Sequence, residues 1–125
     1  MQSGHLQALF PWGLLLVTDD SSSDEIPPWA SDADVVTATP TAVVVRVVHE
    51  QEGTAEVVVR EGESQDMGLI VFDGVIEVPS GRLRVGDALN DQKLIVSVQP
   101  GPHLLRVSVN RPVEASEVSI EIDPV

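Results

Sequence analysis

The feature that most limits how this chain can fold is a set of short segments in which every second residue is apolar. Val43, Val45 and Val47 fall on one side of an extended strand, and similar alternation recurs in 54–60, 69–78, 93–99, 103–110 and 117–122. Valine dominates the apolar residues, and β-branched side chains fit a pleated, half-buried strand better than a helix. No segment carries a helical stripe of similar length, so the sequence predicts an all-β fold.

Turn-forming residues separate these segments about every eight to twelve residues, which is typical of β-sandwiches and barrels. We therefore expect a single domain over 1–125, an antiparallel β-sandwich or jelly roll of about eight strands. Leu6–Val17 reads as a first strand interrupted by Pro11, because proline cannot donate to a sheet ladder. Val35–His49 reads as one long extended segment that forms a hairpin with Thr54–Arg60.

The net charge is −13, and most of it lies in the first half of the chain. Residues 1–66 hold twelve acidic and two basic side chains, whereas residues 67–125 hold eight acidic and five basic ones. This balance argues against nucleic acid and anionic membranes as partners, because both would be repelled. It favours a basic protein partner, with simple solubility as the alternative explanation.

The chain contains no cysteine, which excludes disulfides, thiolate metal sites and a cysteine nucleophile. The residues after Met1 include no basic cluster, and the apolar run 14–17 is followed by two aspartates. Neither a signal peptide nor a membrane-spanning helix fits this pattern, so a cytoplasmic location is expected.

The densest acidic stretch lies in a segment predicted to be a long mobile loop, residues 18–34. It carries six acidic side chains, no basic one, and Trp29 beside Pro28. Acidic charge speeds association with a basic surface, and a buried aromatic ring supplies binding energy. Alternatively, Trp29 covers one end of the sandwich and only holds the loop in place. The predicted partner-binding residues are Asp19, Asp20, Asp24, Glu25, Trp29, Asp32 and Asp34.

The sequence contains no recognisable catalytic or metal-binding constellation, and we expect no enzyme activity and no cofactor. Pro100, Gly101, His103 and Asn110 imitate the second motif of the cupin family with the wrong spacing, and the upstream histidine pair is missing. Ser80 is explained by a Pro-Ser-Gly turn, and the three histidines are scattered. The aspartates of 18–34 lack the spacing and the glycine of a calcium loop.

Part of the C-terminal half resembles small bacterial β-sandwich proteins of the competence protein J, or DNA-entry nuclease inhibitor, type. The resemblance covers roughly residues 70–110, in the runs FDGVIEVPSGRLRVGD (72–87) and VSVQPGPH (96–103) and in Arg106-Val107. It implies a sandwich fold and an acidic protein that occupies the basic active-site groove of a nuclease. The matching positions are turn residues and alternating apolar residues, so no binding residue is transferred.

Together these observations favour a non-catalytic protein-binding module, an immunity-type or nuclease-inhibitor protein that acts on a basic partner surface. The alternative is a self-associating structural domain. A second apolar face, formed by Val44, Val48 and Val58, would then be covered by another copy in a homodimer. A lesser alternative is a cupin-like binder of a small ligand.

Overall fold

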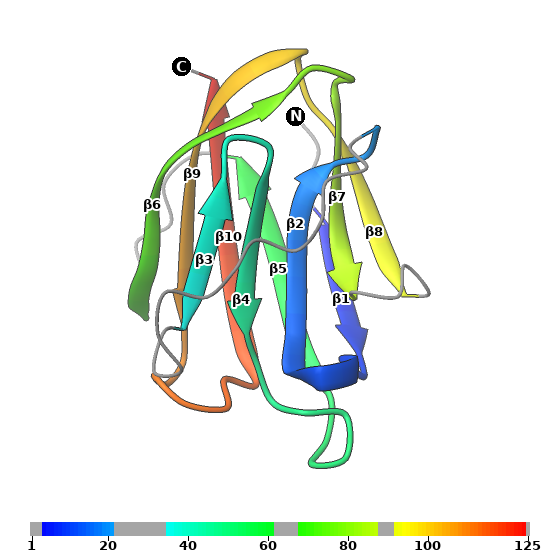
Figure 1. Cartoon of the computed structure of the whole chain (residues 1–125), viewed down its shortest axis with the longest axis vertical. Helices are drawn as coiled ribbons and strands as arrows, with labels where there is room; N and C mark the ends of the chain where they lie inside the picture. The colour runs from blue at the N-terminus through cyan, green and yellow to red at the C-terminus, as the bar shows by residue number, and fades with distance from the viewer. Residues whose placement is uncertain (1–3, 22–34, 62–67, 88–91, 125) are drawn as a thin grey trace.

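Two five-stranded β-sheets pack face to face in the computed structural model, which describes residues 4–21, 35–61, 68–87 and 92–124 (Figure 1). This confirms the prediction of an all-β sandwich, with ten strands in the described residues where about eight were expected. The elements are β1 (Gly4–Ala8), the 3-10 turn η1 (Pro11–Gly13), β2 (Leu14–Asp19), β3 (Val36–Thr39), β4 (Ala42–Arg46), β5 (Ala55–Glu61), β6 (Leu69–Val78), β7 (Arg82–Asp87), β8 (Lys93–Ser97), β9 (Gly101–Val109) and β10 (Glu117–Pro124).

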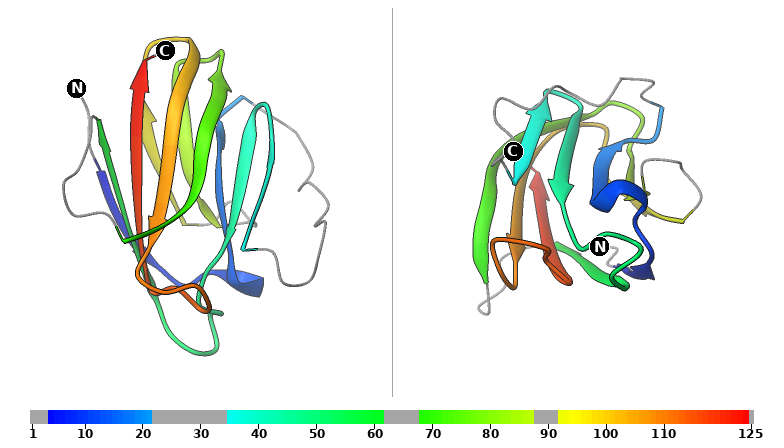
Figure 2. Two further views of the ribbon diagram at one scale, coloured as in Figure 1. Left: turned by 90° about the vertical axis from the view of Figure 1, so that its left-hand side faces the viewer. Right: turned by 60° about the horizontal axis from the view of Figure 1, so that its bottom comes forward.

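The strand order is β1-β5-β10-β9-β6 in one sheet, here called sheet 1, and β3-β4-β2-β7-β8 in the other, called sheet 2. The paired strands run antiparallel apart from β5 and β10, which run parallel. Figure 2 shows the two layers edge-on, with the inner faces turned toward each other. The alternating apolar residues of both sheets meet in this interface and form one core.

The core follows the predicted alternation closely. Val43 and Val45 of β4 are fully buried, as are Val57 and Val59 of β5. Phe10 is also fully buried and is the largest side chain of the core. Burial of aliphatic and aromatic side chains of this size stabilises a fold by roughly 1.5–3 kcal/mol each.

The prediction of one interrupted strand from Leu6 to Val17 is wrong. The chain leaves sheet 1 after β1, turns through η1, and enters sheet 2 as β2. Pro11 opens the turn, and Trp12 and Gly13 both adopt left-handed backbone angles, with φ of 58° and 65°. Two consecutive left-handed residues reverse the chain sharply, which a strand with a simple bulge does not achieve.

The prediction of one long extended segment from Val35 to His49 is also wrong. The segment is a hairpin of β3 and β4 that turns at Pro40 and Thr41. The hairpin expected with Thr54–Arg60 does not form, because β4 lies in sheet 2 and β5 in sheet 1. Pro40 was the available signal, since proline interrupts a strand that would otherwise continue.

The valines that suggested a homodimer are largely covered within one chain. Val44 is fully buried and Val48 is 6% exposed, whereas Val58 is partly buried. The main reason for a second copy on this face is therefore absent, and a homodimer stays an untested alternative.

The N-terminal part of the predicted loop belongs to the sandwich, since β2 extends through Thr18 to Asp19 and both side chains are buried. Residues 22–34 lie outside the described residues, so the mobility predicted for the loop stays a prediction. Among the described residues, no helix is both long and apolar enough to cross a membrane.

Candidate partner-binding surface

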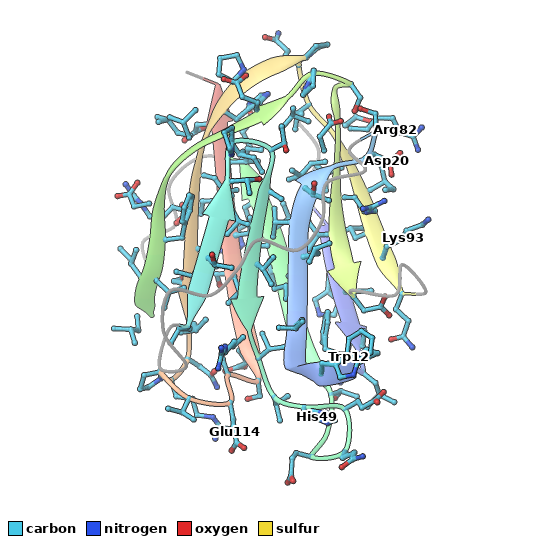
Figure 3. All side chains as sticks on the ribbon, viewed as in Figure 1. Trp12, Asp20, His49, Arg82, Lys93 and Glu114 are labelled. Carbon is cyan, nitrogen blue, oxygen red and sulfur yellow. The ribbon has the colours of Figure 1, made fainter. Side chains whose placement is uncertain are left out.

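Asp19 and Asp20 are the two predicted binding residues that the structure describes, and both lie where β2 ends. The other five, Asp24, Glu25, Trp29, Asp32 and Asp34, lie outside the described residues. Figure 3 shows Asp20 close to Arg82, the first residue of β7, at this end of the sandwich.

The carboxylate of Asp19 is buried, with the residue 1% exposed, and it accepts hydrogen bonds on both oxygens. Its Oδ1 accepts from the backbone N and the Oγ of Ser80, at 3.0 and 2.6 Å. Its Oδ2 accepts from the backbone N of Ser21 at 3.0 Å and from the Ser21 hydroxyl. This cluster, here called the Asp19 clamp, joins the end of β2 to the turn between β6 and β7.

Two opposing effects act on the pKa of Asp19. Burial raises the pKa, because a poorly solvated site disfavours the charged carboxylate. The hydrogen bonds from Ser21 and Ser80 favour the charged form and outweigh burial, so the pKa lies below its ordinary value. The fold therefore stabilises the negative charge of Asp19, and the carboxylate holds Ser21 and Ser80 in place through hydrogen bonds.

Asp20 pairs with two arginines of β7, Arg82 and Arg84. Its carboxylate lies 3.4 Å from Arg82 Nη2 and 3.9 Å from Arg84 Nη1, and its backbone N donates to the Arg82 carbonyl at 2.8 Å. Part of its charge is thus balanced within the chain. On the far side of residues 22–34, the backbone N of Arg46 donates to the carbonyl of Val35 at 2.8 Å. Residues on both sides of the acidic segment are therefore tied to sheet 2.

The three histidines have separate structural surroundings. His103, predicted at the start of a strand, is the third residue of β9 and is 3% exposed, with Nε2 at 2.6 Å from the Gln99 carbonyl oxygen. His5 Nε2 lies 2.7 Å from Glu56 Oε1, and His49 Nδ1 accepts from the backbone N of Gln51 at 3.1 Å. Within the described ranges, no three or more histidines, aspartates or glutamates come together in a way that would hold a metal ion.

A shallow hollow of about 360 Å³ lies among side chains of β5, β9 and β10 in sheet 1. Its lining is mixed, with Val58 and Ser119 between the charged side chains of Glu56 and Arg60. Arg60 lies opposite Glu121 in the sheet register, as Val58 lies opposite Ser119. The hollow offers no cluster of catalytic groups, and we assign it no activity.

One prominent side chain, Trp12, is not where the sequence predicts it. The sequence pattern favours Trp29 as the aromatic anchor and predicts Trp12 within a strand. In the structure Trp12 occupies the middle of η1 and is 62% exposed, the second most exposed of the large apolar residues described. The signal was present in the sequence, because Pro11 and Gly13 flank Trp12 in a pattern typical of a turn.

No family model matches this sequence, and no curated protein matches it. Two solved structures have the same fold. One is ComJ from Bacillus subtilis, described as an inhibitor of the DNA degrading activity of NucA. It is 13% identical, with a TM-score of 0.73, and the match covers 100% of this chain and 96% of ComJ.

The other is described as crocagin biosynthetic gene J, which is 18% identical with a TM-score of 0.58. This match covers 99% of both chains. At such low identity these similarities establish the fold alone. The chain therefore has a ComJ-like β-sandwich fold over its whole length, which confirms the structural part of the resemblance noted in residues 70–110.

Proposed function

We propose that this chain is a non-catalytic binding protein that inhibits a basic protein partner, with a DNA-degrading nuclease as the first candidate. The observation that carries the proposal is the similarity to ComJ, because it extends over the whole chain and ComJ is described as a nuclease inhibitor. A shared fold does not fix a shared function, so the charge of the molecule has to support the same conclusion independently.

The charge distribution supports a basic protein partner. A nuclease presents positive charge to its DNA substrate, and a chain with a net charge of −13 competes electrostatically for that surface. The same charge disfavours an inhibitor that coats the DNA, because phosphates repel it. Inhibition would therefore act through the nuclease.

In this proposal the acidic segment contacts the partner through Asp24, Glu25, Trp29, Asp32 and Asp34, and the Asp19 clamp with Asp20 holds its first residues on the sandwich. A segment tied at its ends loses less conformational entropy on binding than a free one. The fixed ends that the structure describes are consistent with this arrangement.

The test measures binding and DNA cleavage with purified nucleases: NucA, and any nuclease that a gene next to the gene of this chain encodes. We expect inhibition at about one chain per nuclease. Affinity should fall steeply from about 0.01 to about 1 M salt, where the Debye length shrinks from about 30 to about 3 Å. No binding to either nuclease, or DNA cleavage by the chain itself, would overturn the proposal.

Neutralising the segment tests its part separately. The variant Asp24→Asn, Glu25→Gln, Asp32→Asn, Asp34→Asn should associate more slowly and lose salt dependence. A matched control neutralises four acidic residues on strands of sheet 1: Glu61→Gln, Glu77→Gln, Glu117→Gln and Asp123→Asn. Equal losses in both variants would show that only net charge matters and that the segment makes no specific contact.

A further inference from the structure

The turn that leads from sheet 1 into sheet 2 presents an apolar surface at the end of the sandwich opposite the Asp19 clamp. Trp12 is 62% exposed and Leu9 is 42% exposed, and Pro11 lies between them. β2 begins directly after this turn and ends at Asp19, so the two sites are about 20 Å apart at roughly 3.3 Å per strand residue. Figure 3 shows Trp12 and His49 together at this lower end and Asp20 at the upper one.

The backbone of the turn is held from several directions. The carbonyl of Phe10, whose side chain is fully buried, accepts from the backbone N of Gly13 at 2.9 Å and from that of Glu50 at 3.1 Å. The Gly13 carbonyl accepts from the backbone N of Val47 at 2.8 Å, and the backbone N of Leu9 donates to Gln92 Oε1 at 3.1 Å. The indole therefore projects from a backbone that is already fixed, so binding would cost little further conformational entropy.

Trp12 also occupies a backbone conformation that its residue type disfavours. Its φ of 58° and ψ of 9° lie in the left-handed region, which glycine adopts freely and a bulky residue adopts at a cost. Most of the indole contacts solvent, so packing within the chain does not account for a tryptophan at this position. Strained residues of this kind concentrate at binding and switching sites.

The loop beside the turn carries acidic side chains, whereas the end of β4 contributes one basic residue, Arg46, which lies opposite Leu14 in the sheet register. The loop between β4 and β5 carries Glu50 and Glu52, both exposed, and residues 47–54 include no lysine or arginine. The backbone hydrogen bond from Glu50 to Phe10 fixes this loop against the turn. An exposed aromatic side chain with an acidic rim is complementary to a basic protein surface that offers an apolar pocket.

We propose that Leu9, Pro11, Trp12, Glu50 and Glu52 form a docking surface for the basic partner, with the Trp12 indole as its central anchor. This inference rests on the proposed function and adds a second contact, at the end of β2 opposite Asp19. A nucleic acid is disfavoured by the acidic rim, and a second copy would bring another charge of −13 to the contact.

The closing experiment measures the affinity of four proteins for the nuclease that the wild-type chain inhibits. Trp12→Ala should weaken binding by about thirtyfold or more, as expected for an aromatic hot spot, mainly through faster dissociation. Glu50→Gln with Glu52→Gln should slow association severalfold at low salt and less at high salt. Leu104→Ser, which alters an apolar residue that is 49% exposed on β9, is the matched control and should bind like wild type.

A second measurement observes each indole directly. The chain contains two tryptophans, so Trp29→Phe and Trp12→Phe each leave one. With fluorotryptophan incorporated into the chain alone, these two variants assign the two fluorine NMR resonances, and the Trp12 resonance of the wild-type chain should shift when the nuclease is added.

The outcomes separate the two proposals. If the wild-type chain binds neither nuclease, the proposed function fails and this inference fails with it. If wild type binds, but Trp12→Ala binds equally well and the Trp12 resonance does not move, the docking surface is wrong and the proposed function stands. Circular dichroism of Trp12→Ala confirms that any loss of binding does not come from unfolding.

Discussion

At one end of β2 the carboxylate of Asp19 is buried and accepts hydrogen bonds from two serines, whereas beyond the other end the indole of Trp12 is 62% exposed on a left-handed backbone. The charged group is thus the one enclosed by the fold, and the large apolar group is the one that faces solvent. Both arrangements run against the usual preference of these residue types. Each is held in place by contacts with residues far away in the sequence.

This difference shows at which end of β2 a side chain is still available to contact a partner. At the Asp19 clamp the acceptors of the carboxylate already have donors, so this charge mainly stabilises the fold. At the Trp12 turn the backbone on both sides of Trp12 is hydrogen-bonded while most of the indole is exposed, so a partner can still bury the indole. A charged residue therefore marks a binding site only when its charge is free to act outside the chain.

The largest effect is expected from Asp19→Ala, which should lower the free energy of unfolding by about 3 kcal/mol. The substitution removes a buried, charged carboxylate that accepts four hydrogen bonds, two from Ser21 and two from Ser80. Urea denaturation measures the loss. Asp73→Ala, at a carboxylate that is 61% exposed and 3.7 Å from Arg106 Nε, should cost less than about 1 kcal/mol. Similar losses in the two variants would contradict the clamp.

Lowering the pH should remove part of the stabilisation that the Asp19 carboxylate provides. The pKa of Asp19 is lowered in the folded state, while in the unfolded chain it stays near 3.9. The contribution is therefore complete above about pH 5 and is lost as the pH falls through the folded pKa, because the unfolded state binds the proton first. Compared with Asp19→Asn, wild type should lose more stability between about pH 5 and pH 2. Parallel stability curves would show that the hydrogen bonds do not stabilise the charge.

At the Trp12 end, Gly13→Ala should cost about 2 kcal/mol, because it combines a left-handed backbone with a steric clash. A Cβ on Gly13 would lie 2.7 Å from the carbonyl oxygen of Val47, which the backbone cannot easily move. Gly53→Ala serves as the control, since φ is also positive there but nothing lies within 4 Å of the added atom. Thermal unfolding should show the larger loss for Gly13→Ala, and the reverse order would mean that the turn is not held rigidly.

The part of the fold that sequence predicted well depends on local patterns. Alternation placed Val57, Val59 and Leu105 in the core, and turn residues separated the strands. The order of strands in the sheets was not accessible in this way. A strand that leaves one sheet for the other has the same alternation as one that continues, so β4 and β5 looked like a hairpin.

The candidate site was harder to predict, because burial there depends on distant partners. Asp19 looked like an exposed loop charge, and only the approach of Ser80, 61 residues later, encloses it. Trp12 looked like a strand residue, since nothing local shows that Val47 and Glu50 hold the turn in place. Glu121 lies between the buried Ile120 and Ile122, a position where alternation predicts an exposed side chain, and it is only 5% exposed.

A smaller effect on stability is expected when Trp12 is replaced by glycine and, in a second variant, by alanine. Trp12→Gly should be more stable than Trp12→Ala by about 1 kcal/mol, because glycine relieves the left-handed strain that alanine keeps. Both variants lack the indole, so both should bind the nuclease equally weakly. Differential scanning calorimetry gives the stabilities. If alanine is the more stable residue here, Trp12 is not strained and that argument for the docking surface is lost.

The smallest effect is expected from Asp20→Asn, which should change the free energy of unfolding by about 0.5 kcal/mol or less. Asp20 is next to Asp19 in the chain, but its pairs with Arg82 and Arg84 span 3.4 and 3.9 Å, and the Arg82 side chain is 59% exposed. Water and salt screen the Arg82 pair, and the Arg84 pair is more buried but weak at 3.9 Å, so this small change should shrink further at about 1 M salt. Asp19→Asn should remain clearly destabilising under the same conditions, because its hydrogen bonds are enclosed. If Asp19→Asn and Asp20→Asn lost the same stability at about 1 M salt, burial of the Asp19 carboxylate would not explain its contribution. The contrast between the two ends of β2 would then have no physical basis.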